Sequence, residues 1–328
     1  MAYLIGMDEA GYGPNLGPLV VTAVAWEVPG DPRKVDLWSE FEGIVATGPA
    51  SDGEHLQIGD SKAVYSPSRG LAPLETGVLA ALRLHKRPAD SAFPGTLHGV
   101  CRWLHRAFDD EKPSPWMAEH DVPIPHSLNG NGDGPAAHHV VLGDAWRKRC
   151  GERKVTLRGI CCDVVSPRRF NERMCSHDNK ARALSEISFE VLSSLWREIS
   201  PDDKDRVLII ADKHGGRNRY HEFLPIVFGD RFIRCKQESM DLSSYAVGNA
   251  EIRFETRSER HLPVALASMI CKYLRELAMV QFNRFWTTRL ADLKPTAGYP
   301  LDAKRFRAEI AELQQTLGIA DDVLWRER

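Results

Sequence analysis

The sequence has no paired-cysteine motif, no long apolar run and no excess of one charge, and each absence excludes a class of protein. Its seven cysteines include no Cys-x-x-Cys pair, so reduced thiols are expected, not a disulfide framework or a zinc knuckle. No run of about 18 apolar residues occurs, as a membrane-spanning helix would need. Asp8 and Glu9 interrupt the apolar N-terminus, which therefore does not have the pattern of a secretion signal. We expect a cytoplasmic protein that does not enter membranes.

The composition is that of a compact enzyme. The chain has 328 residues, of which 43% are hydrophobic and 27% are charged, and its net charge is −2. We expect one catalytic domain over residues 1–328 and a monomer. A near-neutral chain has no overall attraction for nucleic acid, so such binding would need local basic patches. The candidates are Arg147–Arg149 with Arg153 and Lys154, Lys213–Arg219, and Arg231–Lys236.

Apolar strands alternate with segments of helical periodicity, which predicts an α/β fold with a mixed sheet. A hairpin opens the chain, and a helical segment closes it. The expected strands cover residues 2–7, 19–26, 155–165 and 206–211, and the expected helices cover 76–84, 180–199, 264–282 and 302–317.

The pattern breaks down between residues 87 and 150. Prolines, scattered tryptophans and the turn-rich segment Asn129–Gly134 fill this stretch. We expect an inserted flap or subdomain here, in which Trp103 and Trp116 anchor the insertion to the body.

Four acidic residues lie where strands end or a buried helix begins. Asp8 and Glu9 follow the first strand, Asp212 follows another, and Glu259 precedes the apolar helix. Carboxylates that converge repel one another unless a hard cation such as Mg²⁺ or Mn²⁺ neutralises them. Two such ions can activate water for phosphodiester hydrolysis. Adjacent strand residues point to opposite faces, so Asp8 and Glu9 can share a site only if the strand twists or ends between them. By itself, such an acidic pair is also compatible with a solvated strand edge or a helix cap.

Five motifs in order resemble the type 2 ribonucleases H, the ribonuclease HII and HIII family. They are Asp8–Pro14 with Gly17-Pro18, Asp60-Ser61-Lys62, Ala211-Asp212, Thr256–Leu262 leading into Val264–Lys272, and Gly298-Tyr299-Pro300 with Asp302. The resemblance covers most of the chain except about 87–150 and part of 213–255. It implies a ribonuclease H-like mixed sheet flanked by helices, with a C-terminal helical segment and the large insertion.

The resemblance also implies residue roles. Asp8, Glu9, Asp212 and Glu259 would ligate Mg²⁺ or Mn²⁺ and carry catalysis. Gly11 and Gly13 would present backbone amides to the ribose 2′-hydroxyl, and Tyr299 would stack under the sugar. Tyr12, Ser61, Lys62 and Lys272 complete the implied substrate-binding set. For each lysine, a solvated or structural cation is the alternative.

The chain departs from the family pattern in three places. Tyr12 replaces the usual arginine of the Gly-Arg-Gly turn, which puts the preference for an isolated ribonucleotide in doubt. The spacing from Glu259 to Ser268 is one residue shorter than in the family, so Glu255 or Asp241 is the fallback ligand. The insertion has no family counterpart.

The predicted function is a metal-dependent endoribonuclease. It would cut the RNA strand of RNA–DNA hybrids, or cut at ribonucleotides embedded in DNA during replication and repair, leaving 3′-hydroxyl and 5′-phosphate ends. The alternatives are a non-catalytic nucleic-acid-binding protein of the same fold, and a metal-dependent nuclease or phosphatase indifferent to the 2′-hydroxyl.

Overall fold

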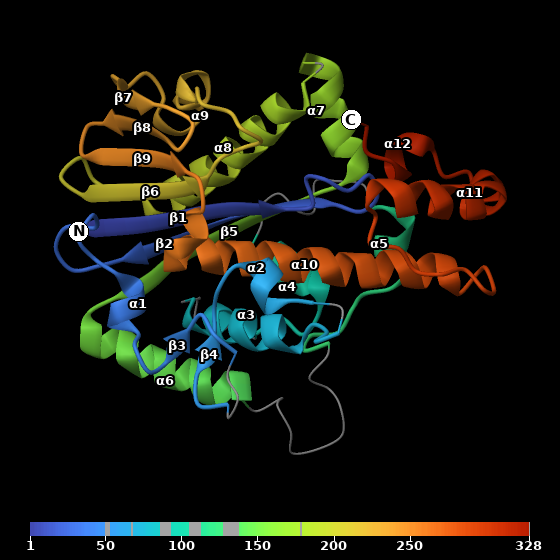
Figure 1. Cartoon of the computed structure of the whole chain (residues 1–328), viewed down its shortest axis with the longest axis horizontal. Helices are drawn as coiled ribbons and strands as arrows, with labels where there is room; N and C mark the ends of the chain where they lie inside the picture. Colours follow the sequence, from blue (N-terminus) through green and yellow to red (C-terminus); the bar gives the residue numbers. More distant parts are fainter. Residues whose placement is uncertain are drawn as a thin grey trace.

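A seven-stranded sheet forms the centre of the molecule (Figure 1). This computed structural model describes residues 1–49, 53–66, 68–85, 93–104, 113–126, 138–177 and 179–327. The turn-rich segment Asn129–Gly134 lies outside the described residues. The strand order is β5-β2-β1-β6-β9-β8-β7. The strands are β1 Ala2–Ala10, β2 Leu19–Glu27, β5 Thr156–Val165, β6 Arg206–Asp212, β7 Arg234–Glu238, β8 Leu242–Val247 and β9 Ala250–Glu255.

The sheet is mixed, as predicted. β1, β6 and β9 are parallel neighbours, and the other pairings are antiparallel. The central strands are apolar along nearly their whole length because both of their faces are covered. A minor pair, β3 Val45–Ala46 and β4 Leu56–Gln57, lies apart from the main sheet.

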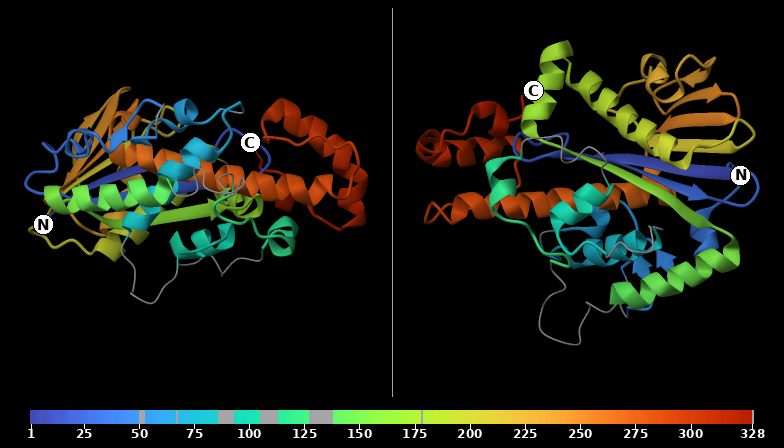
Figure 2. Two further views of the ribbon diagram at one scale, coloured as in Figure 1. Left: turned by 90° about the horizontal axis from the view of Figure 1, so that it is seen from below. Right: turned by 180° about the vertical axis from the view of Figure 1, so that it is seen from behind.

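Helices cover both faces (Figure 2). The helices are α1 Leu37–Glu40, α2 Ser61–Val64, α3 Ala72–Leu84, α4 Leu97–Leu104, α5 Pro115–Glu119, α6 His138–Arg153, α7 Pro167–His177, α8 Lys180–Ile199, α9 Pro225–Phe228, α10 Leu262–Thr287, α11 Pro300–Thr316 and α12 Asp321–Leu324. The described residues also include two short 3₁₀ helices, η3 His221–Phe223 and η4 Ser258–Arg260.

The long helix α10 lies against the face that points toward α3 and α6. Its first half is buried on nearly every side, as its small apolar residues predict. A Cβ atom at Gly6 would overlap the backbone of Pro263 and Val264, so Gly6 lets the helix approach β1 closely. The other face is covered by α8, whose buried residues pack with those of β1, β6 and β9. The sheet therefore separates two apolar cores.

The described parts of the predicted insertion contribute α4, α5 and most of α6. Trp146 of α6 is fully buried against Trp26 and Phe41, and therefore belongs to the core beneath β2. Trp116 of α5 packs on Phe282 and Phe285, an anchoring contact of the expected kind. Whether this stretch acts as a flap stays a prediction.

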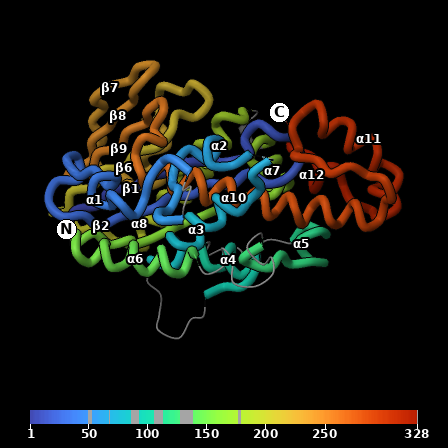
Figure 3. The backbone as a smooth tube through the Cα atoms, turned by 60° about the horizontal axis from the view of Figure 1, so that its bottom comes forward, coloured from blue at the N-terminus to red at the C-terminus, as the bar shows by residue number. Residues whose placement is uncertain are grey.

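The C-terminal helices form the end of the molecule. α11 and α12 lie beside the second half of α10 (Figure 3), and the three share a separate apolar cluster. No helix of the described residues combines the length and apolar character needed to cross a membrane.

The outer strands leave one sheet face open. Beyond β6, no described helix covers β9, β8 and β7 on the side where α10 lies (Figures 1 and 2). The β7–β8 hairpin was not predicted, because β7 is polar throughout and every residue in it is exposed. Helix α7 was also missed.

Candidate functional site

The site begins where two parallel strands end side by side. Met7 of β1 pairs with Ala211 of β6, so the next residues, Asp8 and Asp212, emerge together at the same edge of the sheet. β9 is the neighbour of β6 on the other side, and Glu255 pairs with Asp212. The parallel register thus brings together acidic residues that are far apart in the chain.

Asp8 is buried against α10. Ser268 of α10 lies beside its carboxylate, and the thiol of Cys271 donates to its backbone oxygen at 3.2 Å. Burial, with smaller contributions from the nearby carboxylates Asp212 and Glu259, raises the pKa of Asp8 to about 7 against the opposing effect of Ser268. A buried carboxylate of this kind favours a proton or a cation beside it.

Glu9 belongs to the same electrostatic group. β1 continues through Asp8 and Glu9 to Ala10, so the strand does not end between them. Burial, followed by repulsion from Asp8 and Asp212, nevertheless raises the pKa of Glu9, while Lys62 opposes the shift. Glu9 therefore interacts electrostatically with both predicted aspartates.

Asp212 has a hydrogen-bond donor that the sequence analysis missed. The Ser258 hydroxyl donates to its carboxylate at 3.0 Å. Burial raises the pKa of Asp212, and the Ser258 hydrogen bond counteracts this rise. Ser258 opens η4 and directly precedes Glu259, whose charge acts on Asp8. The residue before Glu259 is thus a serine that holds the Asp212 carboxylate.

Glu255, the fallback ligand, has other partners. Its carboxylate accepts from Arg260 and lies 3.2 Å from Nε2 of His261. The His261 hydrogen bond is the main cause that lowers the pKa of Glu255, against its burial. Glu255 is thus already held by Arg260 and His261, whereas the charge of Glu259 acts on Asp8.

The donor chemistry fits a hard divalent cation, although the ligands are not assembled around one. Asp8, Glu9, Asp212 and Glu259 supply carboxylate oxygens, which Mg²⁺ and Mn²⁺ prefer. Mutual repulsion and burial make an added cation favourable there. In the described part of the chain, however, no three His, Cys, Asp or Glu side chains are close enough together to hold an ion.

The glycine turn that follows β1 uses its two glycines differently. Gly11 has φ +92°, and a Cβ atom there would lie 2.5 Å from the Pro18 oxygen and 2.7 Å from Nε of Arg275. The fold therefore requires glycine at this position. A Cβ atom at Gly13 would meet nothing within 4 Å, so this glycine borders open space. Between them, Tyr12 is half-buried, and Nζ of Lys180 lies 4.6 Å from the centre of its ring.

The predicted substrate-binding residues divide into two groups. Lys62 acts on both Glu9 and Asp212, and Ser61 accepts a hydrogen bond from Ser268 at 3.0 Å. Asp60 fixes this segment by accepting from the Lys62 amide at 3.0 Å. Ser61 and Lys62 thus border the carboxylates.

Lys272 lies farther along α10, and Tyr299 lies just before α11. Lys272 pairs with Glu276 at 2.5 Å and sits over the ring of Tyr65, as expected of a structural cation. Tyr299 is 54% exposed where α11 begins, within electrostatic reach of Arg275. Its exposed ring is available for stacking.

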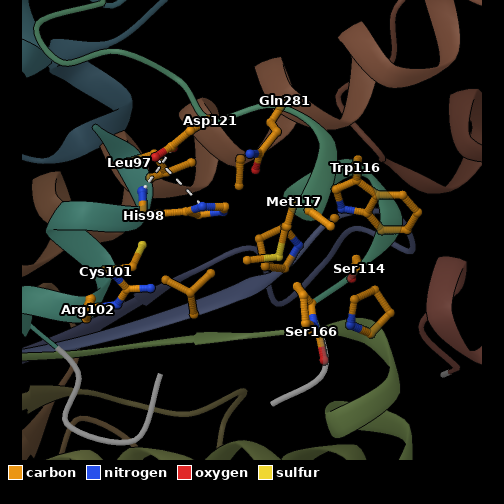
Figure 4. Close-up of a pocket in the computed structure, with 17 residues that line it drawn as sticks. Leu97, His98, Cys101, Arg102, Ser114, Trp116, Met117, Asp121, Ser166 and Gln281 are labelled. Carbon is orange, nitrogen blue, oxygen red and sulfur yellow. Dashed lines mark hydrogen bonds and ion pairs between the residues drawn. The ribbon is translucent and has the colours of Figure 1, made fainter. Parts of the chain in front are cut away.

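A cavity of about 480 Å³ lies elsewhere, between the insertion and the body of the protein (Figure 4). Its walls come from α4, α5, the start of α7 and the loop at Gly17 and Pro18. None of the four predicted carboxylates lines it. The carboxylate site therefore lies at the carboxyl ends of β1 and β6 and not in this cavity.

No protein-family model and no curated protein matches this chain. Solved structures do. Ribonuclease HII of Archaeoglobus fulgidus, in a structure with PCNA, matches at 16% identity and a TM-score of 0.41, over 99% of this chain and 94% of the other. Ribonuclease H2 of Pyrococcus horikoshii matches at 14% identity and a TM-score of 0.41, over 98% of this chain and 92% of the other.

Bst-RNase HIII in complex with Mn²⁺ matches at 16% identity and a TM-score of 0.43. This match covers 99% of the present chain and 66% of that protein, so the chain spans about two thirds of its length. At these identities and TM-scores, the similarity gives no residue role and no chemistry. These three solved structures are of ribonucleases HII, H2 and HIII.

Proposed function

We propose that the protein is a divalent-metal-dependent endoribonuclease that cuts the RNA strand of RNA–DNA hybrids, or cuts at ribonucleotides embedded in DNA. The observation that carries this proposal is the juxtaposition of Asp8 and Asp212 at the ends of β1 and β6. Glu9 and Glu259 act on the same group, and the glycine turn follows directly. Cytoplasmic location, a monomeric state and a role in replication and repair stay predictions.

Asp8, Glu9, Asp212 and Glu259 would hold the metal ions. When bound, two ions would supply an activated water and charge stabilisation for phosphodiester hydrolysis. Ser258 orients Asp212 through a hydrogen bond, Ser268 lies beside Asp8, and Lys62 offsets part of the negative charge of Glu9 and Asp212.

The glycine turn and Tyr299 would recognise the sugar. The open space at Gly13 lets a ribose approach the backbone amides, which a 2′-hydroxyl can contact. Tyr299 presents a half-exposed ring for stacking. Tyr12 lacks the positive charge of an arginine, so a phosphate at the turn would lose that contact.

The test compares cleavage with binding. Asp8→Asn should abolish cleavage of a labelled hybrid in Mg²⁺ or Mn²⁺ and retain affinity for the same hybrid within about threefold. Asp203→Asn is the matched control, because its carboxylate is 84% exposed and remote from the site. Full activity of Asp8→Asn would overturn the proposal.

A non-catalytic nucleic-acid-binding protein is the second candidate. The carboxylates are not assembled around an ion in the described residues, and Tyr12 occupies the turn. Hybrid binding by the wild-type chain without cleavage in either ion would favour this candidate.

A further inference from the structure

The open sheet face beside α10 carries a cluster of cations around one buried carboxylate. Glu251 of β9 is only 4% exposed and has three positively charged partners. Nε of Arg33 lies 3.2 Å from it, Nζ of Lys236 3.0 Å and Nε of Arg253 2.7 Å. Arg33 also lies 3.5 Å from Asp31, so the three cations on Glu251 face two carboxylates and one positive charge is in excess.

The charge of Glu251 is already neutralised locally. Its burial opposes ionisation, but hydrogen bonds from Arg253, Lys236 and Arg33 lower the pKa of Glu251 to about 2. The carboxylate is therefore ionised at neutral pH, and its negative charge offsets one of the three cations around it. The outer cations remain accessible, since the side chains of Arg33 and Lys236 are 38% and 40% exposed.

The strand register adds a further cation to the same face. Arg234 of β7 pairs with Ala246 of β8, which in turn pairs with Glu251. Directly opposed residues of neighbouring strands share a face. Arg234 is exposed and has no carboxylate partner among the described residues. We refer to Arg33, Arg234, Lys236 and Arg253 as the basic shelf.

The basic shelf lies on the side of the sheet to which the active-site carboxylate points. Asp8 contacts Ser268 of α10, so it faces the side covered by α10. Glu251, Arg253 and Glu255 alternate along β9 with Ile252 and Phe254, which pack into the core on the α8 side. The shelf and Asp8 therefore face the same way, and no described helix lies over the shelf (Figure 1).

The distance between the basic shelf and the carboxylates matches the spacing of phosphates along a nucleic-acid strand. Glu255 is the neighbour of Asp212, and Glu251 precedes it by four residues. At about 3.3 Å per strand residue, Arg253 lies about 7 Å from the carboxylates, and Glu251, where Arg33 and Lys236 gather, lies about 13 Å from them. Phosphates follow one another at about 3.4 Å of rise along a strand, so this distance corresponds to about four nucleotides.

We propose that the basic shelf binds the phosphate backbone of the substrate duplex about four nucleotides from the cut site. This inference rests on the proposed function and adds a second contact region to it. The shelf would strengthen binding to long duplexes without any base-specific contact.

The decisive variant is the double substitution Arg33→Ala with Lys236→Ala. It removes two accessible cations and leaves Arg253 paired with Glu251, so the buried carboxylate keeps a partner. The matched control is Arg158→Ala with Arg197→Ala. These exposed arginines lie on β5, the opposite edge strand, and on α8, which covers the other face.

Binding would be measured by fluorescence anisotropy in the Asp8→Asn background, with hybrids of 24 base pairs. Further hybrids would end two base pairs from the cut site on one side or the other. The shelf variant should lose about 3- to 10-fold in affinity for the long hybrid at 0.1 M salt. Its slope of log affinity against log salt should fall by about 1.8, for two lost phosphate contacts. The hybrid truncated on the shelf side should bind wild type and variant equally.

Equal loss on all hybrids, an unchanged salt slope or the same loss in the control would overturn this inference and leave the proposed function intact. A chain with wild-type shelf residues that binds no hybrid would overturn the proposed function as well.

Discussion

The guanidinium of Arg326 donates a hydrogen bond to the backbone oxygen of Gly11, across almost the whole length of the chain. The same nitrogen also donates to the Pro14 oxygen, and the Arg326 amide donates to the Asn15 oxygen at 2.8 Å. Arg326 is 1% exposed and lies 5.3 Å from the centre of the Phe170 ring. The C-terminal segment therefore supports the glycine turn from behind.

Replacing Arg326 should weaken this support. Arg326→Ala leaves the oxygens of Gly11 and Pro14 without their buried donor, which should lower the free energy of unfolding by about 2–3 kcal/mol. Because the turn would also lose its position, kcat for hybrid cleavage should fall more than KM rises. Arg307→Ala is the control, since its side chain binds Asp321 at the surface of the same C-terminal region. Urea unfolding and steady-state kinetics would measure both effects, and an Arg326→Ala protein with unchanged kcat would contradict the positioning role.

The two turn glycines should respond differently to alanine. Gly11→Ala places a Cβ atom against the Pro18 oxygen in a backbone conformation with positive φ, and should destabilise the protein by about 1–3 kcal/mol. Gly13→Ala meets open space and should change stability by less than about 0.5 kcal/mol. If a ribose approaches at Gly13, this second variant should still lose at least about tenfold in kcat/KM, equivalent to about 1.4 kcal/mol. A stable, fully active Gly13→Ala would rule out a close approach of the sugar there.

Glutamine substitutions separate Glu259 from Glu255. Glu259→Gln should reduce cleavage strongly and leave stability unchanged, because Glu259 acts on Asp8 and is only partly buried. Glu255→Gln should mainly reduce stability, because it removes the charge that Arg260 and His261 neutralise. Thermal unfolding and cleavage rates of the two variants, prepared in parallel, provide the comparison. The reverse pattern would make Glu255 the fourth functional carboxylate.

The stability of the metal-free protein should depend on the ionisation of Asp8. Its pKa is about 7 in the folded protein because of burial, against 3.8 for the ordinary side chain. The folded state thus holds this proton more tightly, so stability decreases as pH rises from about 4 to about 7. Asp8→Asn lacks this proton equilibrium, so its stability relative to wild type should increase over that interval by up to about 4 kcal/mol.

Urea unfolding in EDTA at pH 5 and pH 7.5 would measure this difference. Asp203→Asn should follow the wild-type curve at both pH values, because its side chain is exposed. If the free energy of unfolding of Asp8→Asn changed with pH in the same way as that of wild type, the folded-state pKa of Asp8 would not be raised.

The central part of the fold could be predicted from the sequence because its signals are local. The apolar runs of β1 and β6 each end in an acidic residue, and α8 and α10 have clear periodicity or a dense apolar pattern. If β1 and β6 are parallel, their carboxyl ends lie on the same side of the sheet, where ligands bind in α/β folds. This is why Asp8 and Asp212 were predicted together.

Features that depend on distant contacts could not be predicted. β7 reads Arg-Cys-Lys-Gln-Glu without apolar alternation, since it is an exposed edge strand. The role of Arg326 depends on a turn at the other end of the chain, and that of Ser258 on the register between β6 and β9. The basic segment Lys213–Arg219 was a candidate patch, yet Nζ of Lys213 is buried and donates to Asn218 and Ser243 at 2.8 and 3.1 Å. Sequence proximity of cations does not show which of them reach the surface.

Cleavage of three labelled duplexes tests the central claim most directly. The duplexes are an RNA–DNA hybrid, DNA with one ribonucleotide and all-DNA, each incubated with Mg²⁺, Mn²⁺ or EDTA. The proposed function predicts cleavage only of the ribose-containing duplexes and only with a divalent ion. Cleavage of all-DNA at a similar rate, or binding without cleavage in every ion, would contradict it.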